Sequence, residues 1–234
     1  MKPFTHLFFD LDGTLWDFER NSTETLRELY HELNLQKLGI PDFEIFISDY
    51  HQINDRLWAA YKKHEITKDD LSFSRFNLTL ERYGIHDHEL ALAISRLYVE
   101  RSPSKTNLLP CACEVLEALR PHYRMHIITN GFSEIQSRKL QASGLDQYFD
   151  TLITSDEAGV NKPSPAIFEY ALKKTGASAS ESMMIGDEPE ADIEGARGAG
   201  MAQIYVNLKN KPSIEPATYE VGSLCETLAI LTKN

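Results

Sequence analysis

Residues 5–15 read Thr5-His6-Leu7-Phe8-Phe9-Asp10-Leu11-Asp12-Gly13-Thr14-Leu15, a short apolar run that passes directly into two acids and a glycine. An apolar run of this length is typical of a buried strand. Asp10 and Asp12 are two residues apart and face the same way if the chain stays extended, so both carboxylates can address one pocket. The alternative is an ordinary strand end followed by a turn, because Asp12-Gly13 is a common turn dipeptide.

From about residue 110 to 207, further apolar runs alternate with helical stretches. We expect strands at 125–129, 148–155, 182–185 and 203–206, and helices at 110–120, 132–143, 164–175 and 191–199. This alternation predicts an α/β fold, a Rossmann-like parallel sheet with helices on both faces and right-handed crossovers. Ligands of such sheets bind beyond the carboxyl ends of the strands, near the point where the strand order reverses.

Between about residues 18 and 105 helical spacing replaces the strand pattern. Four apolar stripes indicate four helices, at about 26–33, 43–61, 73–83 and 90–98. Asn21 and Glu24 fit a capping-box-like start for the first of them. We therefore expect a catalytic core at 1–17 and 106–234 and an inserted α-helical cap domain at 18–105. A surface loop at 207–219 and a final helix at about 221–232 are expected to end the chain.

The bulk composition is that of a globular protein, with 42% hydrophobic and 25% charged residues. A net charge of -11 disfavours DNA or RNA polymers as partners, although it leaves small anions open. No apolar run approaches the roughly 20 residues that cross a bilayer. The three cysteines, Cys111, Cys113 and Cys225, are an odd number that cannot form a closed disulfide framework. The simplest expectation from these features is a cytoplasmic protein without a membrane partner. The sequence makes no prediction of oligomeric state.

Three more polar stretches lie where predicted strands pass into helices. Thr129-Asn130-Gly131 offers a hydroxyl, an amide and backbone N–H groups, which suit a phosphate oxygen or simply cap a helix. Lys162 lies between prolines in a segment that, taken alone, is typical of a solvated loop. Asp187 and Asp192 follow another strand and can either ligate a hard cation or form an acidic surface loop. Because the fold gathers these junctions at one edge of the sheet, we expect all four stretches to meet.

In this order, the motifs DxDGT, TNG, KP and GDxxxxD resemble those of the haloacid dehalogenase-like hydrolase superfamily, and of its phosphatase majority in particular. The resemblance covers essentially the whole chain, including a helical cap inserted after the first motif. It implies that Asp10 is a nucleophile that becomes an aspartyl-phosphate. It also implies that Asp12 protonates the leaving oxygen and then deprotonates the water that hydrolyses this intermediate.

The same resemblance implies the groups that bind substrate and metal. Thr129, Asn130 and Lys162 would bind the phosphorylated substrate. Mg²⁺ would be held by an Asp10 oxygen, the backbone carbonyl of Asp12 and Asp187, with Asp192 either ligating the ion or orienting a ligand.

Residues 127–132, 148–150 and 159–163 look like a nucleotidase branch that hydrolyses pyrimidine nucleoside monophosphates, and residues 53–61 are similar to its cap. The alternatives are a phosphatase for another small metabolite, such as a sugar phosphate or phosphoglycolate, a phosphomutase, and a non-catalytic binding protein. The 2-haloacid dehalogenases resemble this chain in fold and cap but carry a non-acidic residue where this sequence has Asp12. A halide needs no protonation as it leaves, so Asp12 favours phosphate transfer.

Overall fold

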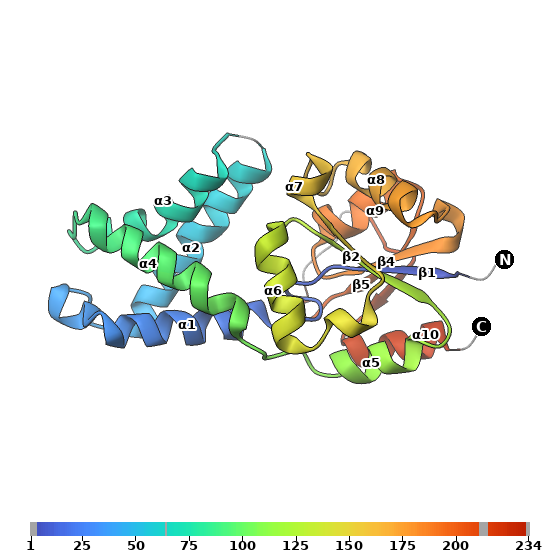
Figure 1. The fold of residues 1–234 in the computed structure, drawn as a ribbon, viewed down its shortest axis with the longest axis horizontal. Coiled ribbons are helices and arrows are strands. Elements are labelled where there is room, and N and C mark those ends of the chain that lie inside the picture. Colours follow the sequence, from blue (N-terminus) through green and yellow to red (C-terminus); the bar gives the residue numbers. More distant parts are fainter. Residues whose placement is uncertain (1–3, 64, 211–214, 233–234) are drawn as a thin grey trace. The chain divides into compact units, whose positions relative to one another are not determined.

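The computed structural model describes residues 4–63, 65–210 and 215–232. The chain divides into two units, one formed by Met1–Phe18 with Lys105–Asn234 and the other by Glu19–Ser104 (Figure 1). The first unit carries a β-sheet and the second is helical. The prediction of a Rossmann-like α/β fold with inserted helices is confirmed.

The first unit is built on six parallel strands in the order β3-β2-β1-β4-β5-β6. The chain order reverses between β1 and β4, and this is the kind of position at which α/β sheets bind ligands. The strands are β1 (His6–Phe9), β2 (Arg124–Thr129), β3 (Thr151–Thr154), β4 (Ser182–Gly186), β5 (Ala202–Val206) and β6 (Tyr219–Val221).

The last strand, β6, differs from the sequence prediction. A loop was expected up to residue 219 and a helix from about 221, but Tyr219–Val221 pairs with β5. Three residues are too few to show the period-2 alternation by which a strand is recognised. Within the expected loop, residues 211–214 lie outside the described residues.

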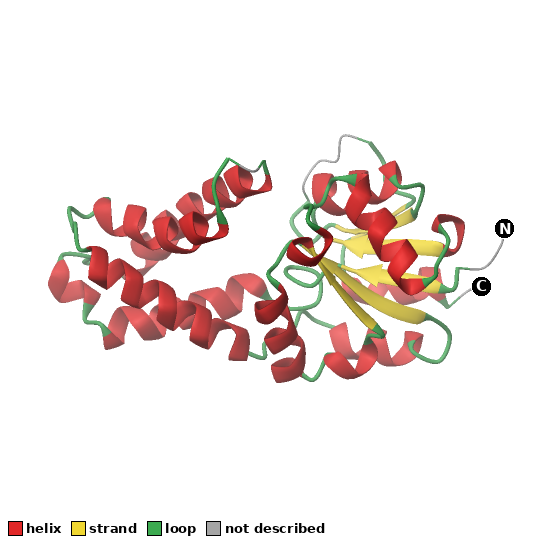
Figure 2. Cartoon of the chain, turned by 45° about the horizontal axis from the view of Figure 1, so that its top comes forward, coloured by secondary structure: helices red, strands yellow, loops and turns green. Residues whose placement is uncertain are grey.

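Helices cover both faces of this sheet (Figure 2). Side chains alternate along each strand, so a strand that is apolar throughout presents apolar side chains to both faces. Leu7 and Phe9 of β1 pack in a core with helices on one face, whereas Phe8 packs in a second core on the other face. The first core includes residues of α5 (Ala112–Leu119), α6 (Ser133–Ser143) and α10 (Thr227–Leu231). The second includes residues of α8 (Pro165–Thr175) and α9 (Gly195–Gly198). The helix α7 (Ser155–Ala158) and the π-helical turn η5 (Pro189–Glu194) also belong to this unit.

The second unit is a bundle of four helices around an aromatic core. The helices are α1 (Phe18–Glu32), α2 (Phe43–Lys62), α3 (Lys68–Glu81) and α4 (His88–Arg101). The capping box expected at Asn21 and Glu24 is wrong, because α1 begins at Phe18 and Asn21 lies buried within it. A capping box occurs instead at the start of α3. There the Asp70 N–H donates to Thr67 Oγ1 at 3.1 Å and the Thr67 N–H donates to Asp70 Oδ2 at 3.0 Å.

No described helix combines the length and the apolar composition that crossing a membrane requires.

One disulfide closes the first unit, which the odd number of cysteines did not lead us to expect. Cys111, at the start of α5, is bonded to Cys225, and their Cα atoms are 5.4 Å apart. Cys113 remains as an exposed free thiol. The pairing joins positions separated by 114 residues, so nothing in the local sequence around either cysteine indicates it.

Loss of this disulfide should lower the free energy of unfolding by about 2–5 kcal/mol, because the bond restricts a long stretch of the unfolded chain. Urea unfolding of Cys111→Ser measures the loss, and Cys113→Ser, which alters only the exposed thiol, should stay within about 0.5 kcal/mol of the parent protein. The unreduced, unfolded chain should show one reactive thiol. Three reactive thiols would contradict the pairing.

Candidate active site

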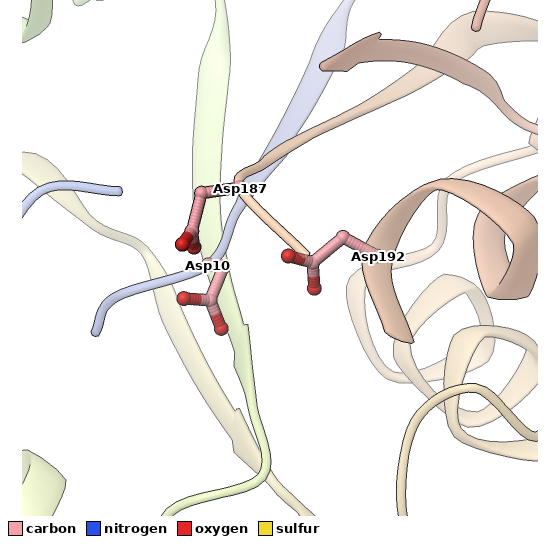
Figure 3. Close-up of side chains that lie close together, drawn as sticks. All are labelled: Asp10, Asp187 and Asp192. Carbon is pink, nitrogen blue, oxygen red and sulfur yellow. The ribbon is translucent and has the colours of Figure 1, made fainter. Parts of the chain in front are cut away.

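Residues from three adjacent strands meet at the carboxyl end of β1. Asp10 directly follows β1, Thr129 ends β2, and Asp187 directly follows β4. The backbone N–H of Asp10 donates to the Ile185 carbonyl at 2.9 Å, so pairing with β4 continues up to the acid. Asp10, Asp187 and Asp192 each present a carboxylate oxygen within 4.8 Å of the others (Figure 3).

The ammonium group of Lys162 lies among these acids, and the residue is only 2% exposed. Its Nζ is 2.6 Å from Asp10 Oδ1 and 2.6 Å from Asp192 Oδ1, and it donates to the Ile128 carbonyl at 2.9 Å. These contacts use all the N–H groups of the ammonium. The alternative of a lysine in a solvated loop is therefore excluded.

The contact between Asp10 and Lys162 opposes the effect of burial on the pKa of each residue. Burial raises the pKa of Asp10 well above its ordinary value, Lys162 lowers this pKa, and the nearby aspartates raise it further. Burial lowers the pKa of Lys162, but the Asp10 and Asp192 carboxylates outweigh burial and raise it, so the ammonium stays protonated. When all three carboxylates are ionised, they and the one ammonium carry two net negative charges, which one divalent cation would balance. The oxygen-rich donor set and its charge thus fit a hard divalent ion.

Gly13 allows the turn after β1 to approach Asp187. Its φ is +92°, and a Cβ at this position would lie 2.7 Å from Asp187 Oδ2. Backbone strain and this clash together exclude a larger residue. The next residue, Thr14, donates from Oγ1 to Asp187 Oδ1 at 3.1 Å. The first motif therefore orients the acid that follows β4 as well as supplying Asp10.

The Asp12 side chain is bound by α6 and does not join the three converging carboxylates. Lys139 Nζ lies 2.6 Å from Asp12 Oδ1 and 2.8 Å from Oδ2, and Gln136 Nε2 donates to Oδ2 at 2.9 Å. The Lys139 ammonium also lies 4.3 Å from the centre of the Trp16 ring. Trp16 is fully buried and donates from Nε1 to the Lys105 carbonyl at 3.0 Å. These contacts separate the two acids of the first motif into two charge environments.

The TNG stretch contributes two different side-chain contacts. The Thr129 hydroxyl oxygen accepts from the Gly131 N–H at 3.1 Å and from Gln136 Nε2 at 2.7 Å. The Asn130 amide binds the backbone of Lys162, since its Oδ1 accepts from the Lys162 N–H at 2.7 Å and its Nδ2 donates to the Lys162 carbonyl at 3.0 Å. The Asn130 side chain therefore holds the loop that carries the buried lysine.

Sequence reasoning missed Gln136 and Lys139. They are three residues apart and lie on one face of α6 together with Leu140, and all three are buried. Two polar side chains on the apolar face of a predicted helix are a usable signal, because burial is costly unless such groups have hydrogen-bond partners.

Comparison with known proteins shows similarity along almost the whole chain. A family model for haloacid dehalogenase-like hydrolases matches residues 4–200. Pyrimidine 5'-nucleotidase YjjG of Escherichia coli is 34% identical over 231 residues, which cover 97% of this chain and 98% of the relative. Pyrimidine 5'-nucleotidase PynA of Streptococcus pneumoniae is 31% identical over 236 residues, which cover 99% of this chain and 96% of the relative. The magnesium-bound structure of the HAD-hydrolase YfnB of Bacillus subtilis has a TM-score of 0.89 at 29% identity and covers 99% of this chain and 100% of that chain.

Replacing the buried lysine by Lys162→Met should lower the free energy of unfolding by about 3–5 kcal/mol in EDTA, because Asp10 and Asp192 then stay buried without their cation. The control is Lys174→Met, which removes a part-exposed pair with Glu157 and should cost at most about 1 kcal/mol. Urea unfolding of both variants measures the difference. Equal losses in the two variants would show that the buried pairs do not stabilise the fold.

Proposed function

The chain belongs to the haloacid dehalogenase-like hydrolase family, and we propose that it is a Mg²⁺-dependent phosphatase that forms an aspartyl-phosphate on Asp10. The observation that carries the proposal is the separation of the two acids of the first motif. Asp10 lies in the buried cluster with Lys162, while Asp12 is bound by Gln136 and Lys139 on α6. Asp10 thus lies beside the acids that would hold the metal, whereas the Asp12 carboxyl lies apart from them and is left for proton transfer.

In the first half-reaction, an oxygen of Asp10 attacks phosphorus, and the bond from phosphorus to the leaving oxygen breaks. Asp12 gives its proton to that oxygen, so the product leaves as an alcohol. In the second half-reaction, Asp12 takes a proton from water, whose oxygen attacks phosphorus and releases inorganic phosphate from Asp10.

Other residues of the site bind and orient the phosphoryl group. Thr129, at the end of β2, donates its hydroxyl to a phosphoryl oxygen. Lys162 acts through its charge, since its N–H groups are used by Asp10, Asp192 and the Ile128 carbonyl. Asn130 acts indirectly, by holding the backbone of Lys162.

Asp10, Asp187 and the backbone carbonyl of Asp12 would hold Mg²⁺. Asp192 would act from outside the ligand shell, because its Oδ1 lies 2.6 Å from Lys162 and its Oδ2 accepts from the Glu188 N–H at 3.0 Å. When bound, the ion supplies positive charge that offsets the charge of the phosphoryl group and of Asp10.

For the substrate we propose a pyrimidine nucleoside monophosphate. Two relatives that are 34% and 31% identical along nearly their whole length are named pyrimidine 5'-nucleotidases, and this supports the choice. A phosphomutase shares the aspartyl-phosphate step and is the second candidate. Release of inorganic phosphate without an acceptor sugar separates the two.

Asp10→Asn should lower kcat by about a thousandfold or more while leaving the fold intact, because the amide keeps the shape but lacks the nucleophilic oxygen. Phosphate release from p-nitrophenyl phosphate measures the loss, and Asp146→Asn, an exposed acid in the same unit, is the matched control. Purified Asp10→Asn protein with a substantial fraction of parental activity would rule out covalent catalysis at this position.

The substrate and metal proposals are tested together by kcat/KM for UMP, dUMP and dTMP against AMP, glucose 6-phosphate and 2-phosphoglycolate. We expect the pyrimidine nucleotides to be preferred by roughly ten- to a hundredfold, the range that stacking of one base provides. EDTA should abolish turnover, and Mg²⁺ should restore it. A clear preference for a sugar phosphate would contradict the nucleotidase proposal but not the phosphatase proposal. Full activity in EDTA would contradict the proposed metal dependence.

A further inference from the structure

Gln136 is a fully buried amide on α6 whose hydrogen bonds reach two different parts of the site. Its Nε2 lies 2.7 Å from Thr129 Oγ1 and 2.9 Å from Asp12 Oδ2. In the ionised form that follows proton transfer, the Asp12 carboxylate only accepts hydrogen bonds, so the amide then presents its NH₂ group to Asp12. The Oε1 atom is buried and has no hydrogen-bond partner among the described residues. The side chain is thus held for its two N–H donors.

These contacts fix the direction of the Thr129 hydroxyl proton. A hydroxyl has one O–H donor and two acceptor lone pairs. Gly131 N–H and Gln136 Nε2 both donate to Thr129 Oγ1, at 3.1 and 2.7 Å, and so occupy both lone pairs. The proton must then point away from these two donors. Within the described ranges no group accepts it, so it is available to an incoming oxygen.

Gly131 makes room for this arrangement. A Cβ at residue 131 would lie 2.4 Å from the Gln136 side chain. A larger residue here would displace the amide from Thr129 and Asp12. The glycine of the TNG stretch and the glutamine of α6 therefore form one packed unit.

We propose that Gln136 is a positioning residue for phosphoryl transfer. Its NH₂ group makes Thr129 an obligate donor to a phosphoryl oxygen and, with Lys139, holds the Asp12 carboxylate in a fixed orientation. This role rests on the proposed phosphatase function. It is separate from the roles of the acids and the lysine, because Gln136 acts only through Thr129 and Asp12.

The test is Gln136→Met, which keeps the length of the side chain and removes both donors. With p-nitrophenyl phosphate and Mg²⁺, kcat should fall about ten- to a hundredfold, the range expected for lost hydrogen bonds to a site hydroxyl and a carboxylate. Gln141→Met, at an exposed position of the same helix, should stay within about twofold of the parent. Circular dichroism and the thermal midpoint establish that each variant is folded.

A double-mutant cycle with Thr129→Val separates positioning from packing. If Gln136 acts through the hydroxyl, Gln136→Met should reduce kcat much less in the Thr129→Val background than in the parent. Equal fold-losses in both backgrounds would overturn the action of Gln136 through Thr129, and a parental kcat for Gln136→Met would overturn the whole inference.

A further variant covers the case in which Gln136→Met does not fold. Gln136→Glu has the same shape but accepts where the amide donates, so it should draw the Thr129 proton away from the substrate and lower kcat at least as much. Near-parental turnover of folded Gln136→Glu would likewise overturn the inference. Absence of phosphate release by the parent protein would instead overturn the phosphatase function itself, and this inference with it.

Discussion

The buried ammonium of Lys162 allows two carboxylates to share one end of the sheet. Asp10 and Asp192 are 7% and 0% exposed, and carboxylates buried this deeply together repel one another unless a cation lies between them. Lys162 approaches an oxygen of each at 2.6 Å. Asn130 in turn binds both the N–H and the carbonyl of Lys162, so the TNG and KP motifs act as a single unit that places one charge.

Sheet order explains why this unit forms from residues far apart in the chain. β1 lies between β2 and β4, and the segments that follow these strands all reach the same edge. Gly13 and Thr14 then couple the end of β1 to Asp187 after β4, by close approach and by a hydrogen bond. Each motif therefore orients a residue of another motif, and no single stretch forms the site alone.

Much of the fold could be predicted from the sequence, because five strands are short apolar runs and the helices of the inserted unit carry apolar stripes at helical spacing. Features that depend on only a few residues, or on a pairing between residues far apart in the sequence, could not be predicted. β6 has three residues, and the Cys111–Cys225 pair spans 114 positions. The acids and Lys162 were identified by motif, but the partners of Asp12 were not, because Gln136 and Lys139 belong to a helix face that also serves the core. A motif indicates candidate reacting groups, whereas the groups that hold them follow only from packing.

The chain leaves the first unit and returns to it along two antiparallel segments joined by backbone hydrogen bonds. Trp16 bridges to Leu108, the Leu109 N–H donates to the Leu15 carbonyl at 2.9 Å, and the Asp17 N–H donates to the Asn107 carbonyl at 3.1 Å. Because departure and return are adjacent, an insertion of almost any length can close on the same bonds, and doubling its length adds only about 0.6 kcal/mol of closure entropy. The junction therefore places no strict limit on the length of the chain inserted between its two segments. The inserted helices can therefore change in length while the backbone hydrogen bonds that join residues 15–17 to residues 107–109 stay the same.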